Sequence, residues 1–155
     1  KRDWSSDVCS SDLWRREVGN SMALIKTHKQ LVDNAMAKIE TLGTTDAIQL
    51  HGDPNVVFVD IRDPRELERE GMIPGAVHAP RGMLEFWIDP SSPYFKDVFG
   101  SGKRFVFYCQ SAWRSALATE TVQDMGLKPV AQLEGGLKAW KEAGGPVAEY
   151  AKKPK

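Results

Sequence analysis

The amino-acid sequence predicts one α/β domain in which a mainly parallel central sheet of about five strands carries helices on both faces. Its 155 residues, 41% of them hydrophobic, are enough for one domain with a substantial core but few for two. The runs "NVVFVDIR" and "KRFVFYC" are almost continuously apolar, which is typical of strands buried on both faces of a parallel sheet. Strand and helix patterns alternate along the chain, which favours crossover connections on both sides of that sheet.

Local signals define the elements in the first half of the chain. Leu31 and Ala35 have helical spacing, and Thr27 can cap the helix that contains them. A threonine cap is also expected for a short helix in "TTDAIQL", while Pro64 and Gly71 mark the two ends of a charged helix. The expected elements are helices over about 27–36, 44–51 and 64–70, and strands over about 39–42, 56–60 and 76–78.

The second half of the chain continues the same alternation. A helical face is expected in "RGMLEFWID", followed by the irregular connection "PSSPYFKDVFGSG" and the buried strand "KRFVFYC". An amphipathic helix in "SALATETVQDMG" then ends at Gly126, and "KPVAQLEGG" and "LKAWKEAGG" supply a last strand and a closing helix. The residues assigned to the buried faces of these helices are Met83, Leu84, Phe86, Trp87, Leu117, Val122, Met125 and Trp140.

The amino-acid composition limits the kinds of molecule that this protein is expected to bind. Lysine plus arginine and aspartate plus glutamate both total 21, so the neutral balance does not indicate nucleic-acid binding. Cys9 and Cys109 belong to no Cys/His cluster, so we expect neither a metal site nor a disulfide framework, and no cofactor. The early apolar stretch "MALI" is far too short for a signal peptide or a membrane span. We therefore expect a cytoplasmic protein that does not bind membranes.

The first residues of the chain have a different character. The Ser- and Asp-rich stretch "KRDWSSDVCSSDL" has no period, which is typical of a disordered tail. The part from Asp3 to Leu13 can also be back-translated into a codon string that resembles a common short-read sequencing adapter. We therefore interpret residues 1–21 as non-native or disordered, with Met22 as the native start. The further expected divisions are a helix and short strand over 22–43, a domain over 44–147 and a tail over 148–155.

Cys109 is the strongest candidate for chemistry. It follows a predicted buried strand and precedes a predicted helix, and in parallel sheets the chemistry lies beyond the carboxyl ends of the strands. A helix N-terminus stabilises a thiolate through its amide hydrogens and its dipole. The loop Gln110 to Trp113 leads to Arg114 and Ser115 in the expected first turn, so an anion near the sulfur can meet a backbone nest and a guanidinium. The alternative is a buried structural cysteine at a strand end.

Four motifs in order carry a family resemblance. The segments "VDIR", "GMIPGAVHAP", "CQSAWRS" and "LEGGLKAW" together resemble the rhodanese (thiosulfate sulfurtransferase) family over about residues 44–147. The resemblance implies a rhodanese-like α/β domain that transfers a sulfane sulfur through a persulfide on Cys109, held by an amide cradle of Gln110, Ser111, Ala112, Trp113 and Arg114. Ala112 departs from the family pattern, which commonly has glycine there. If the loop requires a positive φ, alanine costs about 1 kcal/mol.

The implied reaction takes sulfur from thiosulfate or a similar small donor and passes it to cyanide or a thiol. One alternative is a non-enzymatic persulfide carrier that serves a sulfur-relay protein. Another is a phosphatase or arsenate reductase on the same fold, for which the resemblance implies five residues between cysteine and arginine. Four residues separate Cys109 from Arg114, and this smaller ring suits a single sulfur atom better than a tetrahedral oxyanion.

Several charged and aromatic residues have two interpretations. Arg114 either binds the sulfonate end of thiosulfate or braces the loop through a carboxylate. Asp60 and Arg62 are expected to organise the loop and strand ends. For Arg81, a solvated surface position is favoured over an anion contact at the pocket entrance. His78 is expected to be a hydrogen-bonded turn residue, Trp113 a pocket rim or an exposed anchor, and Gly135 and Gly136 turn residues.

Overall fold

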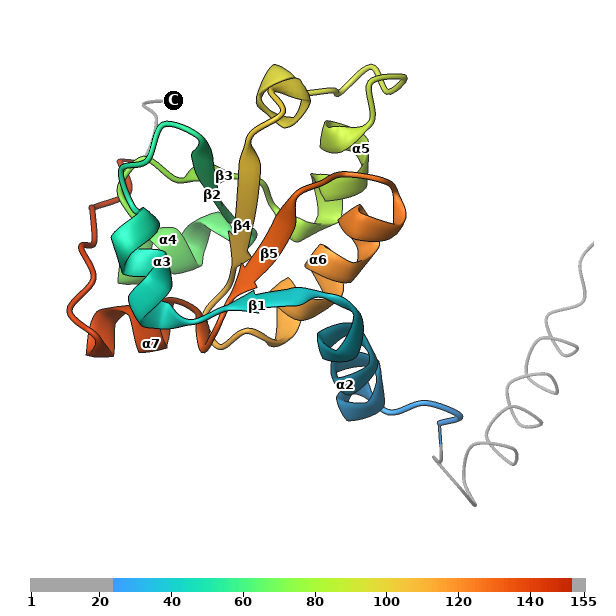
Figure 1. Cartoon of the computed structure of the whole chain (residues 1–155), viewed down its shortest axis with the longest axis horizontal. Coiled ribbons are helices and arrows are strands. Elements are labelled where there is room, and N and C mark those ends of the chain that lie inside the picture. The colour runs from blue at the N-terminus through green and yellow to red at the C-terminus, as the bar shows by residue number, and fades with distance from the viewer. Residues whose placement is uncertain (1–23, 152–155) are drawn as a thin grey trace, which may run out of the picture. The chain divides into compact units, whose positions relative to one another are not determined.

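The structure is a computed structural model that describes residues 24–151. Residues up to Gln30 form a unit separate from the compact unit that begins at Leu31, and the two are described independently. The elements, shown in Figure 1, are α2 (His28–Lys38), β1 (Glu40–Leu42), α3 (Thr44–Leu50), β2 (Val56–Asp60), α4 (Pro64–Glu70), β3 (Val77–His78), the 3-10 turn η1 (Arg81–Met83), α5 (Leu84–Ile88), η2 (Asp97–Gly100), β4 (Arg104–Tyr108), α6 (Trp113–Asp124), β5 (Val130–Leu133) and α7 (Gly136–Glu142).

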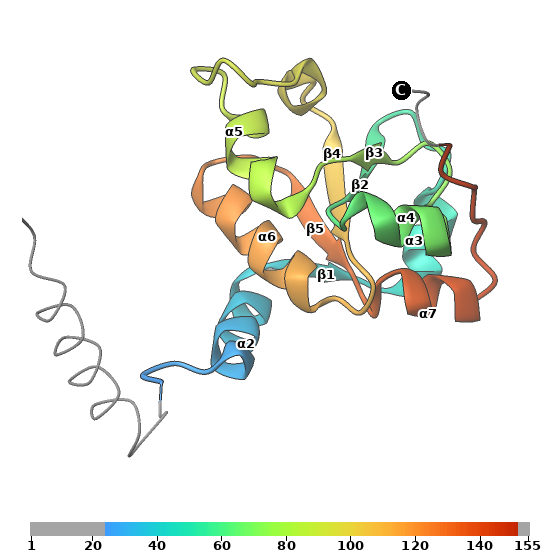
Figure 2. The ribbon, with the colours of Figure 1, turned by 180° about the vertical axis from the view of Figure 1, so that it is seen from behind.

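The sheet confirms the predicted fold class. Its five strands are all parallel and lie in the order β1-β5-β4-β2-β3, with β4 at the centre between β5 and β2. Helices cover both faces, as the opposite views of Figures 1 and 2 show. Because successive strand residues point to opposite faces, Phe105 and Phe107 pack with α5 and α6, while Val106 and Tyr108 pack with α3 and α7.

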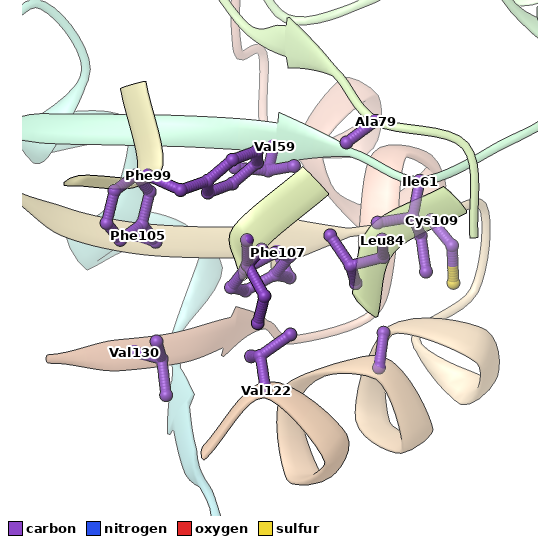
Figure 3. Close-up of a cluster of buried hydrophobic side chains, with 12 residues drawn as sticks. Val59, Ile61, Ala79, Leu84, Phe99, Phe105, Phe107, Cys109, Val122 and Val130 are labelled. Carbon is purple, nitrogen blue, oxygen red and sulfur yellow. The ribbon is translucent and has the colours of Figure 1, made fainter. Parts of the chain in front are cut away.

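The core under α5 and α6 extends to the carboxyl end of β4. Figure 3 shows Phe99 and Phe105 at one end of this cluster, and Cys109 with Ile61 and Leu84 at the other. The sulfur atom of Cys109 therefore lies where the hydrophobic core meets the loop before α6. A cysteine in this position is supported by rigid neighbours on the strand and the helix.

The local signals placed most elements within a residue or two. Strand β2 and helix α4 have the predicted bounds, and Asp63 caps α4 in a capping box with Glu66. Thr27 Oγ1 accepts the hydrogen bond from the amide of Gln30, as expected of a cap. The threonine cap of α3 was wrong, because Gly43 is the N-cap and the Thr44 hydroxyl donates instead to the carbonyl oxygen of Glu134.

Two assignments of buried side chains were also wrong. Phe86 is 51% exposed, because α5 has only five residues and buries Leu84 and Ile88, one turn apart, leaving Phe86 on the other side. Met125 is 46% exposed, because α6 ends at Asp124 and Met125 is its C-cap. Trp140 and Val122 are fully buried, and Met83, Trp87 and Leu117 are partly buried.

The two segments predicted as tails, residues 1–21 and 148–155, lie wholly or partly outside the described residues. The interpretation of residues 1–21 and the start at Met22 lie outside the described residues. At the other end, Ala148 and Met72 exchange two backbone hydrogen bonds of 2.8 and 2.9 Å, so the start of the predicted tail is attached to the domain. Within residues 24–151, no helix has the length and apolar character needed to cross a membrane.

Candidate active site

The candidate site lies at the carboxyl ends of the central strand β4 and its neighbour β2. Asp60, the last residue of β2, is in register with Tyr108, the last residue of β4. Because the strands are parallel, the segments that follow them leave the same edge of the sheet. The topology therefore brings Asp60 and Arg62 next to the loop that begins at Cys109, as the sequence predicted.

Asp60 and Arg62 form a fully buried ion pair. Arg62 donates to both carboxylate oxygens of Asp60 at 2.8–3.3 Å, to the carbonyl oxygen of Gly71 at 2.7 Å and to Gln110 Oε1 at 3.2 Å. Burial disfavours the charge on Arg62, but the hydrogen bonds and negative charge of Asp60 outweigh burial and raise the pKa of the guanidinium. The pair organises the strand ends and holds the side chain of Gln110 in the loop.

Cys109 is 1% exposed, and its loop is anchored from the side of α7. The carbonyl oxygens of Cys109 and Gln110 accept hydrogen bonds from the amides of Leu137, at 2.8 Å, and Lys138, at 3.2 Å. Gly136 makes this approach possible, because a Cβ there would lie 2.6 Å from the carbonyl oxygens of both loop residues. Gly135 and Gly136 are turn residues, as expected, and the close approach at Gly136 also fixes the orientation of the loop peptides.

Five amides of the loop and of the first turn of α6 have no partner among residues 24–151. None of the backbone N–H groups of Gln110, Ser111, Ala112, Arg114 and Ser115 donates a hydrogen bond to another residue in the described part of the chain. Cys109 Sγ lies 3.5 Å from Ser115 Oγ, which places the sulfur beside the first turn of the 12-residue helix α6. The unused amides and the positive end of the helix dipole are therefore available to an anion near the sulfur.

Ala112 occupies the strained position in this loop. Its φ of 74° and ψ of −1° put it in the left-handed region, and it is the N-cap of α6. Among the described residues it is the one non-glycine with a positive φ. The conformational cost that the sequence indicated at this position is present, at about 1 kcal/mol.

Arg114 is engaged by a carboxylate from α4. Its two terminal nitrogens donate to the two oxygens of Glu66, each at 2.8 Å. These hydrogen bonds lower the pKa of Glu66 to about 2 and raise the pKa of Arg114. Of the two interpretations of Arg114, the geometry favours bracing. Glu66 was not predicted as a site residue, although the spacing of Asp63 and Glu66 signalled its capping role.

The remaining candidates lie around this centre. The Arg81 guanidinium pairs with Glu85 and donates to Thr121 Oγ1 at 3.4 Å, so it is engaged away from the loop. Trp113 is 59% exposed at the start of α6, consistent with a rim or anchor. His78 Nε2 lies 2.7 Å from the carbonyl oxygen of Arg62, as expected of a hydrogen-bonded turn histidine.

Neither of two well-formed surface cavities includes Cys109. The first, of about 420 Å³, is lined by Ile88, Asp89, Pro90, Phe99, Met125, Gly126 and Leu127. The second, of about 460 Å³, is lined by residues 68–71 and 147–150. Within residues 24–151 there is also no cluster of three or more His, Cys, Asp or Glu side chains that could hold a metal ion. The chemistry available at the loop is that of a thiol beside free backbone amides.

Comparison with known proteins identifies the family. The rhodanese-like domain matches residues 44–143, so the chain belongs to the rhodanese-like family. A sulfurtransferase of Allochromatium vinosum is 34% identical over 93 residues, which are 60% of this chain and 78% of that protein. An uncharacterized protein of Synechocystis is 35% identical over 68% of this chain, which spans about half (54%) of that relative's length.

Other similar proteins have names of a different enzyme class. The dual specificity phosphatase Cdc25 of Arabidopsis thaliana is 29% identical, covering 88% of this chain and 96% of that protein. A solved structure from Rhodopseudomonas palustris, a protein of unknown function described as a possible tyrosine phosphatase, is 58% identical. It covers 81% of this chain and 97% of its own, with a TM-score of 0.79. The chain is thus similar both to a protein named as a sulfurtransferase and to proteins named as a phosphatase or a possible phosphatase.

Proposed function

We propose that this protein is a sulfurtransferase that carries a sulfane sulfur as a persulfide on Cys109, taking it from thiosulfate or a similar donor. The acceptor is cyanide in an assay and a thiol in the cell. The observation that supports this most directly is that the backbone amides of residues 110–112, 114 and 115 have no partner among the described residues, while Cys109 Sγ lies 3.5 Å from Ser115 Oγ in the first turn of α6. Such amides stabilise a thiolate and the persulfide anion that replaces it.

The reaction divides into two displacements. In the first, the Cys109 thiolate attacks the outer sulfur of thiosulfate, the S–S bond of thiosulfate breaks, and sulfite leaves with the bonding electron pair. In the second, the acceptor attacks the outer sulfur of the persulfide and the Cys109 thiolate leaves. Because both leaving groups are stable anions, neither step needs a general acid. The loop amides hold the charge on sulfur throughout.

The engagement of Arg114 also favours sulfur as the cargo. A phosphatase needs donors for three non-bridging oxygens, and a guanidinium is well suited to supply two of them. Here Glu66 takes both terminal nitrogens of Arg114. The four-residue spacing between Cys109 and Arg114 leaves a small ring, in which the amides can surround one sulfur atom.

The test combines mass spectrometry with two activity assays. Intact protein is treated with thiosulfate, and its mass is measured before and after addition of cyanide, with thiocyanate formation followed in parallel. Wild type is expected to gain one sulfur atom, lose it to cyanide and turn over. Cys109→Ser is expected to gain no sulfur and to form no thiocyanate, while Cys9→Ser is expected to behave as wild type.

Other outcomes identify the alternatives. A persulfide that forms without turnover indicates a carrier that passes sulfur to a protein partner. Hydrolysis of a small aryl phosphate, abolished in Cys109→Ser and without persulfide formation, would refute the proposal in favour of a phosphatase.

A further inference from the structure

A buried chain of hydrogen-bonding side chains runs from Cys109 to the first strand. Cys109 Sγ lies 3.5 Å from Ser115 Oγ, and Ser115 Oγ lies 3.0 Å from Gln132 Oε1 on β5. Gln132 Nε2 in turn lies 3.3 Å from Thr41 Oγ1 on β1 and contacts Met36 Sδ. Ser115 and Gln132 are completely buried, so each depends on the others for its hydrogen bonds.

The chain has a direction. The Cys109 thiol donates to Ser115 Oγ, the Ser115 hydroxyl donates to Gln132 Oε1, and the amide nitrogen of Gln132 donates to Thr41. A serine hydroxyl has one hydrogen, so while it donates to Gln132 it cannot donate to the sulfur. In this arrangement a protonated thiol has an acceptor for its hydrogen, whereas a thiolate receives no hydrogen bond from the Ser115 hydroxyl.

The same residues also allow the opposite direction. If the Ser115 hydroxyl rotates towards the sulfur, Gln132 Oε1 loses its donor. A half turn of the Gln132 amide then brings Nε2 to Ser115 and Oε1 to Thr41, because the two ends of an amide have nearly the same shape. That half turn has a cost, because it puts the acceptor Oε1 in place of Nε2 against Met36 Sδ, itself a weak acceptor, and takes the Thr41 hydroxyl away from its 3.8 Å contact with the same sulfur.

We propose that Gln132 is a positioning residue that acts through Ser115: it competes with the Cys109 sulfur for the hydroxyl hydrogen and so sets how readily the thiol ionises. The inference deepens the proposed function, because the thiolate is the form that attacks the sulfur donor. On ionisation the thiol proton passes to a base in solution, and the side chains change only their orientation.

The charged groups around the sulfur do not depend on the direction of the hydrogen bonds among Ser115, Gln132 and Thr41. The charged and titratable groups on the elements around the loop include Asp60 and Arg62 after β2, Glu66 on α4, Arg81 on η1, Glu85 on α5, Tyr108 on β4, Arg114 on α6 and Lys138 on α7. These groups act on Cys109 in the same way whatever the direction of the Ser115 hydroxyl. Variants of Gln132 and Ser115 leave all of them in place.

The test measures ionisation of Cys109 directly, in a Cys9→Ser background. The rate of alkylation by iodoacetamide is followed against pH, and the midpoint of the profile is compared between variants. Gln132→Met removes the competitor while preserving length, so the midpoint is expected to fall by about one pH unit. Ser115→Ala removes the donor, so the midpoint is expected to rise by about one unit. In Ser115→Ala, adding Gln132→Met is expected to change nothing.

If Gln132 only filled space, its replacement would not lower the midpoint, opposite to the effect of Ser115→Ala, and lose that effect once Ser115 is replaced. Gln132→Leu, a second apolar replacement, is expected to shift the midpoint in the same direction as Gln132→Met. An unchanged or raised midpoint in both Gln132 variants, or an equal shift with and without Ser115, would overturn the inference. Because alkylation requires no sulfur donor, this result is independent of whether the protein transfers sulfur.

Discussion

The carboxyl ends of β2 and β4 lie side by side, but their hydrogen-bond donors differ: those after β2 are paired, and most of those after β4 are not. After β2, the Arg62 guanidinium donates hydrogen bonds to Asp60, Gly71 and Gln110. Both Asp60 and Arg62 are fully buried. After β4, α7 binds the loop carbonyls while the amides from 110 to 112 and at 114 and 115 have no described partner. We call the end of β2, whose donors are paired, the closed end, and the end of β4, whose amides have no described partner, the open end. Breaking each end in turn separates their roles.

The largest loss of stability is expected at the closed end. Arg62→Met leaves the Asp60 carboxylate buried without its partner, which costs about 3–5 kcal/mol. The free energy of unfolding, measured by chemical denaturation, checks the size of the loss. As a control, the double variant Asp60→Asn, Arg62→Met removes both charges and is expected to recover part of it. A single variant as stable as wild type would show that the pair does not organise this edge.

The next effect concerns the anchoring of the open end. Gly136→Ala places a Cβ 2.6 Å from the loop carbonyls at a φ of 65°, so the loop must move. We expect a loss of about 2 kcal/mol or more and loss of sulfur transfer. Gly144→Ala is the matched control, because its φ of 80° is similar and nothing lies within 4 Å of the added atom. Equal effects of the two variants would mean that strain, not loop contact, is responsible.

Relief of strain at the open end gives a gain. Ala112→Gly removes the penalty of about 1 kcal/mol for a left-handed alanine and is expected to stabilise the protein by up to about 0.5 kcal/mol, because the greater flexibility of glycine offsets the rest. Ala37→Gly, the same substitution in helix α2, is expected to lower stability instead. Thermal unfolding of both variants tests the difference in sign. If both variants were less stable than wild type, the alanine at position 112 would not be strained.

The smallest effect is the pH dependence of the brace between α4 and the loop. The pKa of Glu66 is lowered to about 2 in the folded protein, so its contribution is present above the unfolded value of about 4.3. That contribution is lost as the pH falls from about 4.5 towards 2. The pair is partly exposed, so the effect is modest. In Glu66→Gln, denaturation midpoints should fall less steeply over this range; an identical pH slope would exclude the brace.

Local signals explain why much of the fold could be predicted. The apolar run Val56–Asp60, the proline at 64 and the glycine at 71 each act within a few residues, and β2 and α4 have the predicted bounds. Phe86 and Met125 were assigned wrongly because periodicity does not reveal that α5 is one turn long or that α6 ends at Asp124. Helix length depends on packing with the rest of the chain.

The candidate site was only partly predictable for a similar reason. The positions of Cys109 and Asp60 followed from strand ends, and Ala112 stood out against the family pattern. Glu66 reaches Arg114 across 48 residues, and Gln132 reaches Ser115 across 17. Such pairs depend on how the helices and strands are placed in space, and a single sequence contains no local signal for them.

The role of the open strand end can be tested most directly by observing the loop amides while sulfur is bound. We suggest recording amide proton and nitrogen chemical shifts of the protein before thiosulfate, after thiosulfate and after cyanide. The resonances of Ser111, Ala112 and Arg114 are expected to move when the persulfide forms and to return when it is discharged, while those of Ala35 on α2 stay fixed. A persulfide seen by mass spectrometry with no movement of these loop resonances would contradict the account.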